Sequence, residues 1–152
     1  MSTGAVIIAA GLTSQREGFL PLKQVGKLTR AQRVILNFRN AGIQDIVIVT
    51  GSHARELEHS LKEQEVVFLY NQDYATTEMF DSAKIGFRYM LGRCSRVLFT
   101  TVNVTLFTQE TVDLLLESSA PIAVPVYGGR RGHPVLLNSQ AMERILTYTG
   151  EG

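Results

Sequence analysis

The sequence predicts an α/β protein with a Rossmann-like, three-layer architecture and a mostly parallel sheet. Two observations support this prediction. Short apolar runs rich in β-branched residues recur along the chain, as is typical of strands buried in a parallel sheet. Segments with apolar residues at helical spacing lie between these runs, and this alternation favours helices on both faces of the sheet and right-handed crossovers.

The first expected strand is residues 5–10, Ala-Val-Ile-Ile-Ala-Ala, whose unbroken apolar character places it in the centre of the sheet. Gly11 follows, where the missing Cβ permits a sharp turn and a close approach by a ligand. Ligands of open α/β sheets bind beyond the carboxyl ends of the strands. The connection at 11–27 is therefore the predicted site, because a plain strand-to-helix connection is usually shorter.

The later elements follow from periodicity and capping signals. Thr29 and Gln32 have the spacing of a capping box, so a helix begins there, and Gly42 provides its end. Other helices show apolar residues three and four positions apart, and other strands are short β-branched runs. We expect strands at 45–50, 66–70 and 96–101. The helix between the first two strands faces the core through Ala54, Leu57 and Leu61. The helix between the second and the third faces it through Phe80, Ala83, Phe87 and Met90.

The last third of the chain repeats the pattern with one difference. Thr108 is the expected N-cap of a helix, and 122–126 is the next expected strand. The glycine-rich stretch 127–133 predicts a local hairpin or an antiparallel edge before a strand at 134–137. A short final helix opens at Ser139.

The composition describes one globular domain over residues 1–152. Of these residues 45% are hydrophobic, which is enough to bury a sizeable core. A net charge of +1 without a basic run argues against a nucleic-acid partner. The single cysteine, Cys94, fits a reducing cytoplasm, and the opening apolar run is too short for a signal peptide or a membrane span. We therefore expect a cytoplasmic protein without a membrane partner.

Four stretches of the chain match the motifs of one family in order and spacing. They are Ala9-Ala10-Gly11-Leu12-Thr13-Ser14, Tyr70-Asn71 with 78–86, the strand and loop at 97–107, and the turn at 129–134. Together they resemble the MobA-like nucleotidyltransferases, which include the molybdenum-cofactor cytidylyl- and guanylyltransferases. The resemblance covers the whole chain and implies a fold like that of the nucleotide-diphospho-sugar transferases.

This resemblance implies a reaction and a set of site residues. The reaction is transfer of a nucleotidyl group from a nucleoside triphosphate, with CTP or GTP favoured, to a phosphate-bearing acceptor such as a molybdopterin, with release of pyrophosphate and with Mg²⁺ as the cofactor. The implied nucleotide-binding residues are Ala10, Gly11, Leu12, Thr13, Asn71 and Ser82, and the implied acceptor-binding residues are Arg130, Arg131, Gly132 and His133.

The chain departs from the family pattern at its charged positions. The family's cations have no equivalent in register, so the resemblance assigns the catalytic role to Arg16 and Lys23, with Lys27 as a further candidate. Asn103 stands where the family has a metal-binding Asp, and a neutral amide binds Mg²⁺ more weakly than a carboxylate. The sequence ends before the family's next strand and second acidic ligand, so either the chain is truncated at residue 152 or the second ligand is missing.

Three interpretations therefore stay open. The chain is an active nucleotidyltransferase, a catalytically degenerate nucleotide-binding or regulatory module on the same fold, or another doubly wound domain. The number of acids at the strand ends separates the first two. Asp73, Glu78 and Asp81 are the other acids in the relevant loops, and Asp81 is better explained as a charge at a helix N-terminus. Whether the protein forms a homodimer is also left open.

Overall fold

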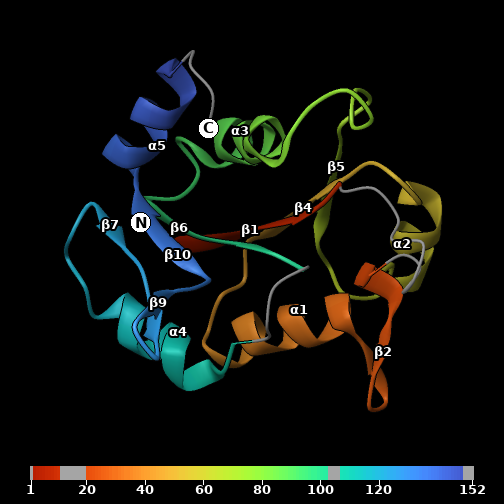
Figure 1. Cartoon of the computed structure of the whole chain (residues 1–152), viewed down its shortest axis with the longest axis horizontal. Helices are drawn as coiled ribbons and strands as arrows, with labels where there is room; N and C mark the ends of the chain where they lie inside the picture. The colour runs from red at the N-terminus through yellow and green to blue at the C-terminus, as the bar shows by residue number, and fades with distance from the viewer. Residues whose placement is uncertain (1, 11–19, 103–106, 149–152) are drawn as a thin grey trace.

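The computed structural model describes residues 2–10, 20–102 and 107–148, which form one open six-stranded sheet and two small two-stranded sheets. Within these residues the strands of the six-stranded sheet are β1 (Thr3–Ala9), β4 (Ile46–Thr50), β5 (Val67–Tyr70), β6 (Arg96–Thr101), β7 (Ile122–Ala123) and β10 (Val135–Asn138). Their spatial order is β5-β4-β1-β6-β10-β7 (Figure 1). The first four strands in this order are parallel, and β10 runs antiparallel to its neighbours β6 and β7. The predicted α/β class with a mostly parallel sheet is confirmed.

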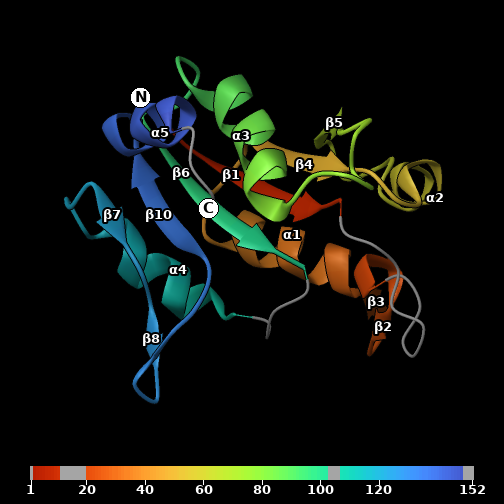
Figure 2. The same ribbon diagram turned by 45° about the horizontal axis from the view of Figure 1, so that its top comes forward.

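Helices cover both faces of the sheet, which gives the predicted three layers. One face is covered by α1 (Arg30–Asn40), α2 (Ala54–Ser60) and α4 (Gln109–Leu116), and the other by α3 (Met79–Met90) and α5 (Ser139–Thr147) (Figure 2). Each face has its own apolar core. Ile7 of β1 packs into the first core and Val6 into the second, because successive strand residues point to opposite faces.

Side-chain caps place the helix starts where the sequence predicts them. The Thr29 hydroxyl accepts a hydrogen bond from the Gln32 amide at 3.2 Å, and the Gln32 side chain accepts one from the Thr29 amide at 2.8 Å. Thr108 caps α4 through the amide of Thr111. At the start of α3, the Asp81 carboxylate accepts a hydrogen bond from the backbone amide of Glu78. The interpretation of Asp81 as a charge at a helix N-terminus is therefore confirmed.

Two sequence expectations need correction. The connection at 11–27 is not loop throughout, because its described part holds the 3₁₀ turn η1 (Leu20–Leu22) and the strand β2 (Gln24–Val25), which pairs with β3 (Leu28–Thr29). The expected strand at 122–126 is divided between two sheets: β7 belongs to the main sheet, and β8 (Val126–Tyr127) pairs with β9 (Arg130–Arg131). Pro125 lies between them and has no amide hydrogen to continue a ladder.

The predicted local hairpin at the Gly-Gly turn is present as the β8–β9 pair. Gly128 and Gly129 both have positive φ, at 56° and 82°, which suits a two-residue hairpin turn. None of the helices in the described residues has the length and apolar character needed to cross a membrane.

Candidate functional site

The strand order reverses between β1 and β6, and we use the term crevice for the region beyond the carboxyl ends of these two strands. Along the chain, β4 and β5 follow on one side of β1, whereas β6 lies on its other side. In open α/β sheets, ligands bind beyond the carboxyl ends of the strands where the strand order reverses in this way. Ala10 follows β1 and Val102 follows β6, so these two residues lie at the carboxyl ends of neighbouring strands. The two strands run side by side in Figure 2.

The same edge of the sheet gathers several of the predicted site residues. Ala10 is buried there, and its carbonyl oxygen would lie 3.0 Å from a Cβ placed on Gly51, which follows β4. Asn71 follows β5, and its amide donates a hydrogen bond to the Thr50 carbonyl at 2.8 Å. His133 comes two residues before the antiparallel strand β10, whose start lies beside the end of β6. Motifs far apart in the sequence therefore lie along one edge of the sheet.

Asn71 is the centre of a buried polar network. Its side-chain amide donates to the Ser82 hydroxyl at 3.0 Å and to the Thr77 hydroxyl at 3.1 Å, and its side-chain oxygen accepts from the Asp73 amide at 3.0 Å. Asn71 and Ser82 are 4% and 3% exposed, so their contact joins the end of β5 to the first turn of α3 away from solvent, whereas Asp73 is exposed and Thr77 half-buried. The Ser82 hydroxyl acts as an acceptor in this contact, which leaves its proton to donate elsewhere.

The turn before β10 positions a half-buried histidine. The imidazole of His133 lies 6.1 Å from the ring of Phe99, centroid to centroid, and burial lowers the pKa of His133 from its usual value. Gly132 lies against Tyr127, and a Cβ at Gly132 would come within 2.6 Å of that ring. The Tyr127 hydroxyl donates to the His133 carbonyl at 3.3 Å. Close packing of Tyr127 thus fixes the backbone of this turn.

The remaining predicted residues are either exposed or lie outside the described part of the chain. Arg130 and Arg131 form β9 and are exposed, so they lie on the hairpin and outside the buried network. Lys23 is exposed, and its carbonyl accepts a hydrogen bond from the Arg30 amide at 2.8 Å. The other predictions lie outside the described residues; these are Gly11, Leu12, Thr13, Arg16 and Asn103.

Arg30 is a residue of this edge that the sequence analysis missed. It is the first residue of α1, and its Nη1 donates to the carbonyl of Val102 at 3.3 Å. Its Nε is buried and has no hydrogen-bond partner. A cation in the first turn of a helix opposes the helix dipole, and this unfavourable placement is the signal that could have identified it.

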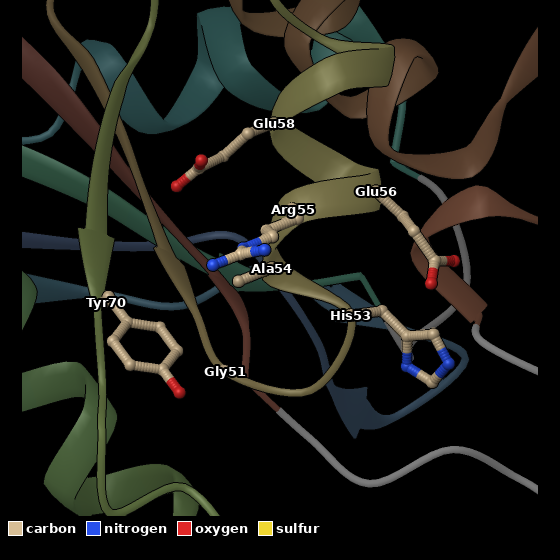
Figure 3. A pocket seen from close by; sticks show the side chains of 7 residues that line it. All are labelled: Gly51, His53, Ala54, Arg55, Glu56, Glu58 and Tyr70. Atoms are coloured by element: carbon tan, nitrogen blue, oxygen red, sulfur yellow. The ribbon is translucent and has the colours of Figure 1, made fainter.

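A cavity of about 510 Å³ adjoins this edge between α2 and β5. Figure 3 shows the Tyr70 ring and the Arg55 side chain approaching it from opposite elements, with Glu58 further along α2. Its lining is mostly polar and mixes both signs of charge, so the cavity does not select an anion or a cation by charge alone. The lining residues are Gly51, His53, Ala54, Arg55, Glu56, Glu58 and Tyr70.

The described side chains at this edge do not form a Mg²⁺ site. Mg²⁺ prefers carboxylate oxygens, whereas Asn71, Ser82 and His133 offer an amide, a hydroxyl and an imidazole. Nowhere in the described ranges do three or more His, Cys, Asp or Glu side chains gather in a group that could hold a metal ion.

Cys94 lies away from this edge. It is 1% exposed and precedes β6, at the opposite end of that strand, and burial raises the pKa of its thiol.

Solved structures of other proteins are similar to this chain over nearly its whole length. A nucleotidyl transferase from Methanothermobacter thermautotroptrophicus is 20% identical and has a TM-score of 0.84, over 98% of this chain and 77% of that chain. Rv0371c from Mycobacterium tuberculosis is 14% identical with a TM-score of 0.84, over 99% of this chain and 78% of that chain, and it has also been solved as a manganese complex. At these identities the structural likeness shows the fold, which is that of nucleotidyltransferases.

Among curated proteins, the bifunctional protein GlmU from Clostridium tetani is 25% identical over 115 residues. The match covers 74% of this chain and 25% of GlmU, so the chain spans about a quarter of that relative's length. A family model described as the MobA-like NTP transferase domain matches residues 5–152. The chain therefore belongs to the MobA-like NTP transferase family.

Proposed function

We propose that the chain transfers a nucleotidyl group from a nucleoside triphosphate to a small phosphate-bearing acceptor and releases pyrophosphate. The observation that supports this most directly is that Ala10, Asn71 and His133 all lie along the edge of the sheet where the parallel strands end, with Ser82 bonded to Asn71. Each of these residues lies in one of the stretches that resemble the family's motifs. We propose CTP or GTP as the donor and a molybdopterin as an example of the acceptor.

In the proposed reaction an oxygen of the acceptor phosphate attacks the α-phosphorus. The bond from that phosphorus to the oxygen bridging the β-phosphate breaks, and pyrophosphate leaves with the bonding electrons. Ser82, oriented by Asn71, would donate its spare proton to the nucleotide. Arg16 and Lys23 would offset the charge of the phosphates, and the turn at Gly132 and His133, with Arg130 and Arg131, would bind the acceptor.

A non-catalytic nucleotide-binding module is the second candidate. It is favoured by the amide of Asn103 at the position where the family has a carboxylate, and by the lack of an acidic cluster among the described residues. In the family's chemistry a divalent cation such as Mg²⁺ supplies charge neutralisation on the phosphates. A chain that no longer binds the cation would be inactive, but it would still bind nucleotide at the carboxyl-end edge of the sheet.

Thermal unfolding with CTP, GTP, ATP and UTP, each with and without Mg²⁺, tests both candidates. A ligand at a hundred times its Kd stabilises the folded state by about 2.7 kcal/mol, and for a chain of this size that raises Tm by about 5–10 °C. We expect such a rise for CTP or GTP, and we expect Ser82→Ala to reduce it. Ser60→Ala on α2 is the matched control, which should respond as the wild type does.

Pyrophosphate release then separates the enzyme from the module. An active enzyme releases pyrophosphate with a molybdopterin acceptor and Mg²⁺. A module shows the nucleotide shift without release, and Asn103→Asp should then raise release above that of the wild type. A wild type that shows no shift with any nucleotide would overturn the proposal in both forms.

A further inference from the structure

Arg30 reaches the carboxyl end of β6, because its guanidinium contacts the carbonyl of Val102, the residue that follows this strand. The end of β6 lies on the α1 side of the molecule in Figure 1 and overlaps part of α1 in the turned view of Figure 2. From the first turn of α1, Nη1 of Arg30 donates a hydrogen bond to the carbonyl of Val102, and the Arg30 backbone amide donates one to the carbonyl of Lys23. One residue therefore connects the chain entering α1 with the chain leaving β6.

The guanidinium of Arg30 has more hydrogen-bond donors than the described residues accept from. A guanidinium has five N–H donors, and here its side chain makes a single hydrogen bond to the described residues, to Val102. Its Nε is buried without a partner, which is costly for a charged group. Its charge also lies at the positive end of the helix dipole, and the first turn of α1 contains no acid to offset it.

Arg39 on the same helix shows what a structural arginine looks like in this protein. It lies in the last turn of α1, where a cation favours the helix dipole. Its guanidinium donates three hydrogen bonds to backbone carbonyls, at 2.6 Å to Gln44, 2.9 Å to Gln64 and 3.0 Å to Glu65. Arg39 is explained by its contacts within the fold, whereas Arg30 retains donors and charge for which residues 2–10, 20–102 and 107–148 supply no further partner.

We infer that Arg30 is a phosphate-binding residue of the crevice. An arginine fork matches phosphate oxygens in geometry and stays charged at every physiological pH. The hydrogen bond from Nη1 to Val102 already restricts the rotamers of the Arg30 side chain, so phosphate binding would cost less side-chain entropy. This inference rests on the proposed function for the identity of the phosphate, which is that of the nucleotide, and it adds a cation that the family motifs do not include.

Calorimetric titration with inorganic tripolyphosphate, CTP, GTP and cytidine tests this role. The variants are Arg30→Met, which keeps an apolar stem, Arg30→Lys, which keeps the charge, and Arg39→Met as the matched control on the same helix. We expect Arg30→Met to weaken tripolyphosphate and triphosphate binding at least tenfold and to reduce its dependence on salt concentration. Arg30→Lys should recover part of the affinity, and Arg39→Met should leave it unchanged.

Cytidine carries no phosphate and separates a binding role from a structural one. If Arg30 only shaped the crevice, Arg30→Met would weaken cytidine and CTP binding alike, and the inference would fall. It would also fall if Arg30→Met bound tripolyphosphate as tightly as the wild type, or if the wild type bound neither tripolyphosphate nor nucleotide. Tripolyphosphate binding that depends on Arg30, without nucleotide binding, would support the inference and overturn the proposed function.

Discussion

His133 shows how burial changes the chemistry of a single side chain. Its imidazole is half-buried against Phe99, and this desolvation lowers the pKa of His133 from 6.5. The neutral ring is therefore favoured in the folded state. Between the lowered folded pKa and the unfolded pKa, the unfolded chain binds more protons than the folded chain, so the free energy of unfolding decreases as the pH falls.

We therefore predict that His133 makes the fold sensitive to acid. Its stabilising contribution is complete above pH 6.5 and is lost as the pH falls through the folded pKa of His133. Between pH 7.5 and 5.5 the Tm of the wild type should decrease more than the Tm of His133→Gln. The variant His59→Gln changes an exposed ring and should follow the wild type. Equal slopes for wild type and His133→Gln would contradict the prediction.

The candidate site shows what residue types and spacing can reveal. Asn71 and Ser82 were both predicted to bind nucleotide, but no spacing rule indicates that they also bind each other across eleven positions. Arg30 was missed because its unfavourable place in the first turn of a helix does not indicate which group its side chain contacts. Its bond to Val102 spans 72 positions, so only the folded chain brings the two residues together.

At the scale of elements, local signals predict starts and ends well, but they do not predict which sheet a strand joins. The spacing of Thr29 and Gln32 identifies a helix start because both partners of the capping box lie within one turn. By contrast, 122–126 looks like one apolar run, and its division depends on pairing with β10 on one side and β9 on the other. Those partners are set by the whole fold.

Gly86 determines how closely α3 approaches the central strands. A Cβ at this position would overlap Cγ1 of Val6 and would lie 3.5 Å from Cγ2 of Val49. Gly86→Ala should therefore destabilise the protein by about 1–2 kcal/mol, because overpacking of about 1–3 kcal/mol exceeds the gain in helix propensity of up to about 1 kcal/mol. Denaturant unfolding measures this difference.

Two further variants make the Gly86 prediction specific. In the Gly86→Ala background, Val6→Ala should cost less than it does in the wild type, because it removes the atom that the new Cβ meets. Arg88→Ala, on the exposed side of α3, should change the free energy of unfolding by less than about 0.5 kcal/mol. A neutral or stabilising Gly86→Ala would show that α3 can move away from the sheet.

At the scale of the whole molecule, the layers were predictable and the full strand order was not. Alternating strands and helices require a sheet covered on both faces, so the three layers follow from the pattern. The pattern does not say that β6 pairs with β1 on the side away from β4. That one choice places the reversal in strand order, and with it the crevice, beside Ala10.

The two cores share β1, and we predict that they unfold together. Ile7 packs on the α1 side and Ile8 on the α3 side, and both are at most 5% exposed. Ile7→Val and Ile8→Val remove the same methyl group from opposite cores, so each should lower the free energy of unfolding by about 0.5–1.5 kcal/mol. Because the two side chains point to opposite faces, the double variant should show the sum within about 0.5 kcal/mol. Far-UV circular dichroism and tyrosine fluorescence should follow one coincident transition in all four proteins. Transitions that separate in either single variant would show that one helical layer unfolds before the other.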